Sequence, residues 1–228
     1  MNFQQTEKKV EKYFGILEQC PLFSGITREE LSRMLGCLDA RVAFFDKKYT
    51  VFAEGTPAKY VGVLLSGGAQ TERVDYEGNR NLLSSIAPGE VFGEAFACAE
   101  MRAIPVSVVA TEPSEVLLLD CNHILRTCTK GCSFHQKLIF NLMKDLALKS
   151  LAFHQKLEVT SKRTTREKLM TYLSHMAQKT GKRSFDIPFD RQALADYLEV
   201  DRSGLSAEIS KLTREGILRS RKKHFELE

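Results

Sequence analysis

The sequence lacks the long apolar segments that a membrane protein needs. Its longest apolar runs, such as those at 61–65 and 116–119, are far shorter than the roughly 20 residues that cross a bilayer as a helix. The N-terminal residues are charged and contain no apolar signal-peptide core. At 43% hydrophobic and 27% charged residues, the composition is that of an ordinary globular protein. We therefore expect a cytoplasmic protein with no membrane partner.

Cysteine is sparse and scattered. The one pair that is close in the sequence, Cys128 and Cys132, has the spacing of neither a zinc ribbon nor a redox Cys-x-x-Cys motif. We interpret the cysteines as reduced, buried or surface thiols, as is usual in the cytoplasm, and leave a redox role open. They are Cys20, Cys37, Cys98, Cys121, Cys128 and Cys132.

Positive charge is concentrated in the last third of the chain. The net charge is only +4, but residues 161–228 contain 15 Lys and Arg against 10 Asp and Glu. The first 160 residues contain 18 basic and 19 acidic residues. A local excess of this kind is typical of a nucleic-acid-binding region, although basic tails are common in other proteins.

The pattern of residues 41–120 predicts short strands that are separated by Gly, Pro and Asn turns. Residues 1–40 precede them as short helices, with Thr27 as an N-cap and Glu30 at the third helical position. Strand spacings near ten residues are typical of an antiparallel sandwich or barrel. The expected strands are 41–45, 60–65, 69–74, 81–86, 106–111 and 115–120, with a hairpin tip at 77–79.

The features of an enzyme are missing. There is no catalytic triad, and Gly67-Gly68 is not followed by the Gly-Lys of a phosphate-binding loop. None of the five His residues lies in the strand region, whereas a metalloenzyme built on such strands needs inward His and carboxylate ligands. We predict that the protein is not an enzyme and binds no metal, with a β-barrel metalloenzyme as a minor alternative.

Residues 134–157 form a segment without Gly or Pro that predicts one long helix of about 36 Å. Such a helix is longer than a small domain needs. A heptad-like apolar pattern indicates a dimerisation seam, and the alternative is a helix that packs only on its own β-domain. The predicted seam consists of Leu138, Ile139, Leu142, Leu146 and Phe153.

Residues 189–212 predict two helices joined by a tight turn. Asp190 and Asp201 are the expected N-caps, the small Ala195 allows close helix approach, and Gly216 ends the second helix. The second helix presents Arg202, Ser203 and Ser206 near its N-terminus, where they can meet base edges in the major groove of DNA. A hairpin at 217–227 with a basic tip follows. Phosphates would be held by Arg191, Gln192, Lys222 and Lys223.

From Pro21 to Leu227 the chain resembles the catabolite-activator/fumarate-nitrate-reductase (CRP/FNR) regulator family. The resemblance rests on the segments 21–23, 67–68, 88–94 and 201–206 in this order, joined by the long helix. It implies an α+β protein: an N-terminal antiparallel β-roll of the cyclic-nucleotide-binding, jelly-roll type with its helices at 1–130, a dimerisation helix at 131–160, and a C-terminal winged helix-turn-helix at 161–228. It also implies a homodimer on a palindromic site in double-stranded DNA, a partner in RNA polymerase, and a small effector in the β-roll.

The effector implied by the resemblance is not cyclic AMP. Where cyclic-AMP-binding members have an Arg-Ser pair, this sequence has Ile104-Pro105, so the counter-charge for a phosphate is missing. Arg102 is the alternative phosphate ligand of a cyclic-nucleotide-responsive regulator. Closely spaced N-terminal cysteines for an iron–sulfur cluster are missing too, and neither a cluster nor haem is expected. The expected effector residues are Phe92, Gly93, Glu94, Ala95, Phe96, Arg102, Ile104 and Pro105.

The helix-turn-helix departs from well-known members of the family at three positions. Glu199 stands at a turn position often occupied by Gly, where a left-handed backbone costs roughly 1–2 kcal/mol. Ser203 and Ala207 replace longer base-reading residues, so a different DNA preference is expected. The sequence leaves open the identity of the effector, the target promoters, the direction of regulation, and whether the effector-free form binds DNA.

Overall fold

The computed structural model describes residues 10–74, 77, 80–125 and 133–228. The turn expected at 77–79 and the Cys128 and Cys132 pair fall largely or wholly outside these residues. The chain divides into two compact units, Met1–Ala147 (unit 1) and Leu148–Glu228 (unit 2), and the division falls within helix α6 (Ser133–Thr160). Among the described residues, no helix is both long enough and apolar enough to cross a membrane.

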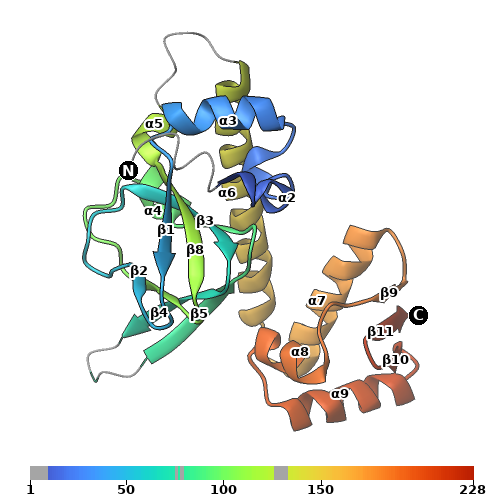
Figure 1. Cartoon of the computed structure of the whole chain (residues 1–228). Coiled ribbons are helices and arrows are strands. Elements are labelled where there is room, and N and C mark those ends of the chain that lie inside the picture. Colours follow the sequence, from blue (N-terminus) through green and yellow to red (C-terminus); the bar gives the residue numbers. More distant parts are fainter. Residues whose placement is uncertain (1–9, 75–76, 78–79, 126–132) are drawn as a thin grey trace. The chain divides into compact units, whose positions relative to one another are not determined.

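Unit 1 contains two four-stranded antiparallel sheets (Figure 1). All six predicted strands are present, with ends that shift by a residue or two. Two further strands were not predicted, because three and two residues are too short to show an alternating pattern. One sheet has the order β1 (Arg41–Phe45), β8 (Ser114–Asp120), β3 (Tyr60–Ser66), β6 (Val91–Phe92); the other has the order β2 (Thr50–Phe52), β7 (Ser107–Ala110), β4 (Ala69–Val74), β5 (Arg80–Ile86).

The space between the two sheets is filled by apolar side chains. Phe92 lies in this interior, and its ring packs against Phe52 with centroids 5.2 Å apart. Gly62 on the neighbouring strand β3 faces the Phe92 ring, and a Cβ at that position would overlap it. The interior is therefore a packed core at this point. Its buried members are Leu64, Ala69, Ile86, Phe92, Val108 and Val116.

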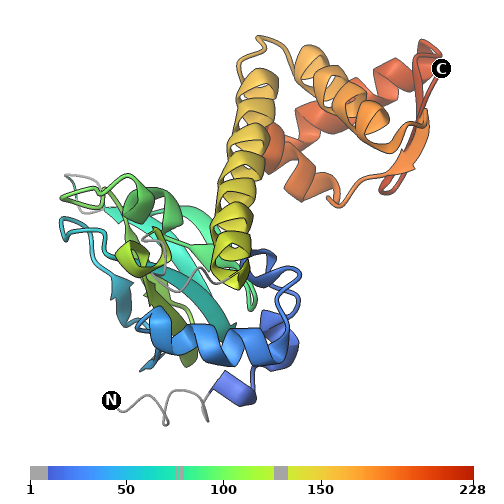
Figure 2. The same ribbon diagram turned by 90° about the horizontal axis from the view of Figure 1, so that it is seen from above.

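Helices cover the outer face of the β1-β8-β3-β6 sheet (Figures 1 and 2). The Thr27 cap is confirmed, because the Glu30 amide donates to Thr27 Oγ1 at 3.2 Å and the Thr27 amide donates back to Glu30 Oε2 at 2.9 Å. The helices of unit 1 are α2 (Phe14–Leu17), the 3₁₀ turn η1 (Pro21–Phe23), α3 (Arg28–Cys37), α4 (Glu94–Cys98), α5 (Cys121–Leu125) and the first half of α6.

Helix α6 contradicts the predicted dimerisation seam. Leu138 and Leu142 are buried in the core of unit 1, and Ile139 and Leu146 pack against that core, so these four side chains stabilise the unit itself. The error has a simple cause: apolar residues occur on several sides of α6, and periodicity alone does not show which side faces the sheet. Phe153 is exposed, but it lies on a different side of the helix from the exposed Phe140.

Unit 2 is a small helical domain with a three-stranded sheet of order β10-β11-β9. Thr164 caps α7 through a reciprocal pair of hydrogen bonds with Glu167, and Gly181 ends it with a left-handed backbone. The buried core combines Val159 at the end of α6 with side chains from every later element. The elements are α7 (Thr165–Thr180), β9 (Ser184–Asp186), α8 (Arg191–Leu198), α9 (Arg202–Arg214), β10 (Leu218–Arg221) and β11 (His224–Leu227).

The fit of Phe92 against Gly62 can be tested by Gly62→Ala. The added methyl group must displace the Phe92 ring, and overpacking of this kind costs about 1–3 kcal/mol in the free energy of unfolding. Urea denaturation followed by circular dichroism measures the change. Gly15→Ala is the matched control, because no atom lies within 4 Å of its added methyl group and the stability of unit 1 should be unchanged or slightly raised. Equal stabilities for both variants would contradict this packing.

Candidate DNA interface and effector site

The two helices of the helix-turn-helix are capped as predicted. The Ala193 amide donates to Asp190 Oδ1 at 2.8 Å, and the Gly204 amide donates to Asp201 Oδ2 at 2.9 Å. The backbone hydrogen bond from Ala193 lowers the pKa of the Asp190 carboxyl. The Ser203 hydroxyl, followed by the Gly204 amide, lowers the pKa of Asp201. Both carboxylates therefore stay ionised at neutral pH, and their negative charge stabilises the N-terminal ends of the two helices.

The turn between α8 and α9 uses a left-handed residue at the expected position. Glu199 has φ +53° and ψ +54°. Its backbone carbonyl accepts a hydrogen bond from Lys168 Nζ at 3.3 Å, and its side chain lies 3.9 Å from Lys156 Nζ. The left-handed Glu199 is thus contacted by α7 through Lys168 and by α6 through Lys156.

Helix α9 buries one side and exposes the other. Leu205, Ile209 and Leu212 are buried, whereas Arg202 and Ser203 are exposed. The periodicity of three and four residues in the sequence predicted this division.

The serine hydroxyls of α9 are already used as donors. Ser203 donates to Asp201, and Ser206 Oγ donates to the Arg202 carbonyl at 2.9 Å. In this arrangement both serines present acceptor lone pairs to a partner. The exposed guanidinium of Arg202 can donate two parallel hydrogen bonds to guanine, which makes it the main candidate for base recognition.

Arg191 links α8 to the C-terminal hairpin. Its Nη2 donates to Ser220 Oγ at 3.2 Å, and its guanidinium carbon lies 5.6 Å from the centroid of the Phe225 ring. Burial lowers the pKa of this guanidinium. Arg191 is therefore partly occupied in holding the fold, and its contact with a DNA phosphate remains a prediction.

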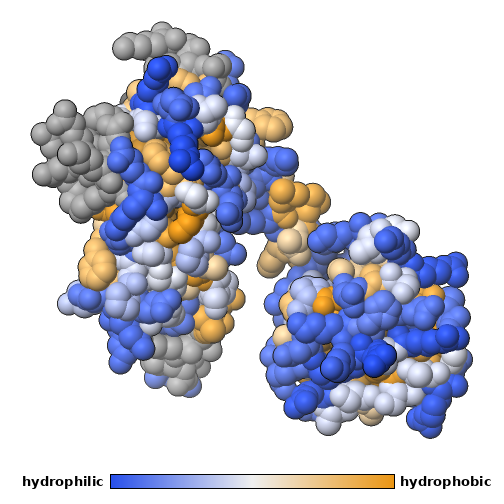
Figure 3. All heavy atoms as spheres, turned by 45° about the vertical axis from the view of Figure 1, so that its right-hand side comes forward, coloured by the Kyte–Doolittle hydropathy of each residue, from blue (hydrophilic) through white to orange (hydrophobic). Residues whose placement is uncertain are grey.

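The hairpin formed by β10 and β11 has the predicted basic tip. Arg221 pairs with His224, so Lys222 and Lys223 form the turn, and Lys222 has φ +55°. Both lysines are exposed, and Lys223 Nζ donates to the Pro188 carbonyl at 3.1 Å. Gln192 is exposed as well, and its side-chain amide donates to Asp196 Oδ1 at 2.9 Å. A hydrophilic surface (blue) covers most of the face of unit 2 in Figure 3.

A groove between α9 and β10 contains polar residues that the sequence did not single out. It has a volume of about 450 Å³. Ser210 Oγ donates to the Ser206 carbonyl at 2.9 Å, and Thr213 Oγ1 donates to the Ile209 carbonyl at 2.9 Å. Their positions four and seven residues after Ser206 were the available signal. The lining residues are Arg191, Ser206, Ile209, Ser210, Thr213, Arg214 and Ser220.

The residues predicted to bind the effector lie in different surroundings, and their role in binding stays a prediction. Phe92 is part of the core between the sheets. Ile104 is buried, and its backbone pairs with Gly55 and Thr56 at 2.8 and 2.9 Å. Ala95 and Pro105 are exposed.

Helix α4 begins at Glu94, with Gly93 as its N-cap, and Phe96 lies within this helix. Gly93 has φ +77°, and a Cβ there would lie 2.5 Å from the Phe52 ring. This position therefore requires glycine for both its backbone and its surroundings. Glu94 is buried, whereas Phe96 is half-buried.

Arg102 lies on a separate surface pocket of unit 1. The pocket has a volume of about 660 Å³ and also includes Lys59, whose Nζ lies 3.3 Å from Asp120 Oδ2. Among the described residues, no Lys or Arg is buried, whereas Glu72, Glu94 and Asp120 are. The buried charge in unit 1 is therefore negative, and the available positive charge stands at the surface.

Two cysteines that are distant in the sequence are close together in unit 1. Cys98 Sγ, at the end of α4, lies 3.7 Å from Cys121 Sγ, at the start of α5. The hydrogen bond between them lowers the pKa of Cys98 and raises that of Cys121. The sequence did not single out this pair, because the Cys98–Cys121 contact depends on packing between the two helices.

The geometry agrees with two domain families. Residues 42–130 match the family described as "Cyclic nucleotide-binding domain", and residues 167–228 match "Crp-like helix-turn-helix domain". The CRP-like cAMP-activated global transcriptional regulator of Mycobacterium tuberculosis (strain CDC 1551 / Oshkosh) is 30% identical over 79 residues, which are 35% of this chain and 34% of that protein. The chain thus matches only about a third of this relative's length.

A longer but weaker similarity extends across both units. Transcriptional activator protein FnrL of Cereibacter sphaeroides is 21% identical over 184 residues, which are 74% of this chain and 68% of that protein. The crystal structure of DNR from Pseudomonas aeruginosa has a TM-score of 0.50 and 21% identity, and covers 100% of this chain and 96% of that one. This similarity shows a shared fold.

The chain thus combines two domains, a β-roll of the cyclic-nucleotide-binding type and a winged helix-turn-helix. This combination defines its class of protein. The chain belongs to the CRP/FNR family within this class. The α+β fold predicted from the sequence is confirmed. The curated relatives are transcriptional regulators and not enzymes, in agreement with the expectation for this chain.

The left-handed conformation of Glu199 can be tested by Glu199→Gly. Glycine removes the steric cost of the positive φ, and we expect the free energy of unfolding of unit 2 to rise by about 1 kcal/mol. Glu199→Ala is the matched control: it removes the same carboxylate but keeps the Cβ, so it should not stabilise the unit. Denaturant unfolding of both variants measures the difference. Equal stabilities would contradict a steric cost of the left-handed backbone at Glu199.

Proposed function

We propose that this chain is a homodimeric, sequence-specific, DNA-binding transcription regulator that responds to a small effector bound by unit 1. The observation that supports this most strongly is the exposed first turn of α9, where Arg202 projects from a capped helix. The major groove, about 12 Å wide, admits one such helix. Arg202 would read a base, and the acceptor oxygens of Ser203 and Ser206 would read neighbouring donors.

The residues around α9 are suited to hold the DNA backbone. Lys222 and Lys223 at the hairpin tip and Gln192 at the start of α8 are exposed, and Arg191 borders the same groove as Ser206. Contacts of this kind supply affinity and salt dependence but little sequence information. Ser210 and Arg214 extend the proposed interface along α9.

The proposed dimer uses a different side of α6 from the predicted seam. Phe140 and Met143 are 61% and 57% exposed, and the small residue Ala147 follows four residues later. Their spacing of three and four residues places them opposite the buried Leu138 and Leu142, in a coiled-coil-like stripe. Two copies that pack along this stripe would bring two α9 helices to a palindromic site.

The effector proposed for unit 1 is not cyclic AMP. A cyclic phosphate that enters the roll would find no buried Lys or Arg among the described residues. An uncompensated anion in such a place is very costly. The Phe52 and Phe92 rings also occupy part of the interior.

The second candidate is a cyclic-nucleotide-responsive regulator that binds the phosphate through Arg102. The match to the cyclic nucleotide-binding domain family favours it, and so does the surface pocket that contains Arg102 and Lys59. A cytoplasmic location and contact with RNA polymerase remain predictions that come from the family resemblance.

Base reading by Arg202 predicts a defined effect of Arg202→Ala. The loss of two hydrogen bonds to a base should cost about 1–3 kcal/mol on the specific site and relax the preference at one position of each half-site. The specific site is first obtained by selection from a random DNA pool with the purified protein. Titration of both proteins on this site and on single-base variants measures the effect.

Arg183→Ala is the matched control, because it removes an exposed arginine of unit 2 outside the proposed interface. It should preserve the sequence preference. The selection is run with and without cyclic AMP, and a palindrome recovered equally in both supports an effector other than cyclic AMP. A palindrome recovered only with the nucleotide supports the Arg102 candidate. No enriched sequence in either condition would contradict sequence-specific DNA binding by the effector-free protein and by its cyclic AMP complex.

The apolar stripe on α6 predicts that Met143→Glu dissociates the dimer. A carboxylate in the centre of an apolar interface would be buried without a partner, and we expect at least a tenfold increase in the dissociation constant of the dimer. Sedimentation velocity over a concentration series measures it. Phe153→Glu places the same charge on a residue that is 67% exposed on another side of α6, and it should leave the dimer intact. Dissociation by Phe153→Glu alone would restore the seam that the sequence predicted.

A further inference from the structure

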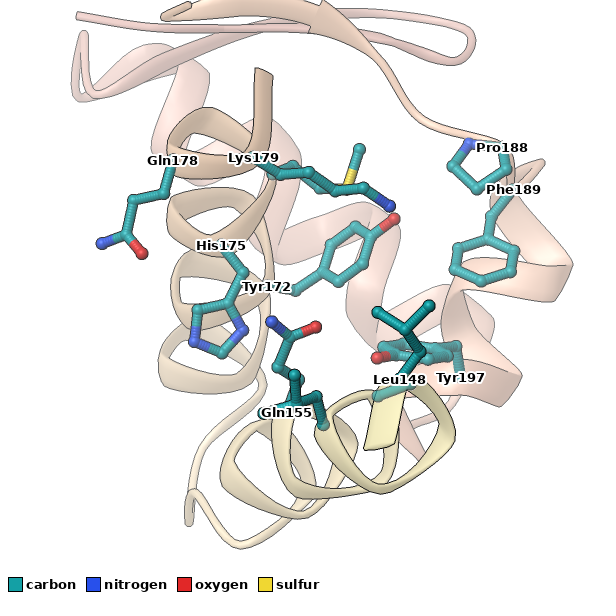
Figure 4. Close-up of a pocket in the computed structure, with 12 residues that line it drawn as sticks. Leu148, Gln155, Tyr172, His175, Gln178, Lys179, Pro188, Phe189 and Tyr197 are labelled. Carbon is teal, nitrogen blue, oxygen red and sulfur yellow. The ribbon is translucent and has the colours of Figure 1, made fainter. Parts of the chain in front are cut away.

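A large pocket lies within unit 2, away from the exposed surface of α9. It has a volume of about 600 Å³, which is in the range of sites for small organic ligands. The second half of α6 forms one wall through Leu148 and Ala152, and α7 forms the other (Figure 4). Residues 188–189 and Tyr197 of α8 close the remaining side. We call it the α6–α7 pocket.

Three aromatic rings give the α6–α7 pocket a defined shape. The ring centroids of Phe189 and Tyr197 are 5.0 Å apart, those of Tyr172 and Tyr197 are 5.3 Å apart, and those of Tyr172 and Phe189 are 6.0 Å apart. The ring planes of Phe189 and Tyr197 are inclined to each other by 30° in a stacked arrangement. Mutual packing of this kind restricts the rings and preforms an apolar wall against which a flat ring can stack.

The hydroxyl of Tyr172 lacks a hydrogen-bond partner among the described residues, although the residue is only 5% exposed. In Figure 4 the Tyr172 ring extends from α7 into the pocket, with its hydroxyl directed away from the helix. Burial, with a smaller effect of Tyr197, raises the pKa of the phenol to about 12. The group is thus a protonated donor at neutral pH. A buried donor without an acceptor is costly and requires an explanation.

The polar groups around the pocket favour a negatively charged ligand. The exposed Lys179 lines the pocket, and its side chain extends in the same direction as the Tyr172 hydroxyl in Figure 4. Gln155 and Gln178 add neutral amides, and His175 Nε2 lies 3.1 Å from Glu158 Oε2. No Asp or Glu belongs to the lining of this pocket.

We propose that the α6–α7 pocket binds a small aromatic carboxylate. The ring of the ligand stacks in the apolar space between Leu148 and the aromatic wall. One carboxylate oxygen accepts the hydrogen bond of Tyr172, and the charge is balanced by Lys179. This site is additional to the effector site proposed in unit 1, and binding to it does not depend on the DNA-binding function.

The α6 residues that line the pocket are Leu148, Leu151, Ala152 and Gln155, and all of them follow Phe140, Met143 and Ala147 of the proposed dimer stripe in the sequence. A ligand there would touch Phe189, which precedes the cap of α8, and Tyr197 near the end of α8.

The test uses 2-naphthoate as the probe and 2-naphthylmethylammonium as its oppositely charged counterpart. Isothermal titration of the full chain should show saturable binding of 2-naphthoate, with at least tenfold weaker binding of the ammonium compound. Ala152→Trp fills the pocket and should abolish binding. Ser150→Trp is the matched control, because it adds the same bulk to α6 outside the pocket and should preserve binding.

Tyr172→Phe separates a ligand-binding role from a structural one. It removes a hydroxyl that is unpartnered in the free protein, so the Tm of the free protein should stay the same or rise. The affinity for 2-naphthoate should fall about tenfold, because the hydrogen bond to the carboxylate is lost. Lys179→Gln should weaken 2-naphthoate binding and reduce the preference over the ammonium compound.

Several results would overturn the proposal. They are no binding of 2-naphthoate at millimolar concentration, equal binding of both probes, or binding that survives Ala152→Trp. A lower Tm for Tyr172→Phe with unchanged affinity would also overturn it, because the hydroxyl would then serve the fold. None of these outcomes bears on DNA binding, so the two proposals can fail separately.

Discussion

Helix α6 contributes to the core of each unit, and most of the other features depend on this burial. Leu138 and Leu142 are buried in unit 1, and Val159 is buried in unit 2. Because these side chains are buried in the two cores, they are not available for other contacts. The apolar side chains of α6 that remain exposed are available for contacts with a second copy of the chain or with a ligand. Phe140 and Met143 form the proposed dimer stripe, and Leu148 borders the proposed ligand pocket.

The chemistry of unit 1 follows from what fills the roll. Gly62 has no side chain, Phe92 takes that space, and Gly93 lets Phe52 approach closely. Among the described residues, no Lys or Arg of unit 1 is buried, so an anion inside the roll would lack a buried counter-charge. The proposed pocket of unit 2 has an exposed cation, Lys179, beside it. This difference underlies the two ligand proposals, which are an anionic ligand for unit 2 and an effector other than cyclic AMP for the roll.

The local structure of the candidate DNA interface could be predicted from the sequence, because interactions between nearby residues define it. Asp190 and Asp201 cap helices through residues three positions away, and the apolar periodicity of α9 shows which side is buried. Which of the predicted effector residues lie close together could not be predicted, because their side chains are arranged by the path of the chain between α4 and β7. The contact between Cys98 and Cys121 depends on helix packing in the same way.

The sequence by itself determined the caps, the buried and exposed sides of α9 and the basic hairpin tip, because these arise from interactions between residues that are close along the chain. The α+β class and the place of Glu199 in the turn followed from the family resemblance. Only the tertiary structure decided which side of α6 is buried, which aromatic rings enclose a pocket, and that the Tyr172 hydroxyl finds no partner among the described residues. Those properties depend on distances between residues that are far apart in the chain. A side chain of given polarity can satisfy several such arrangements, and only packing selects one of them.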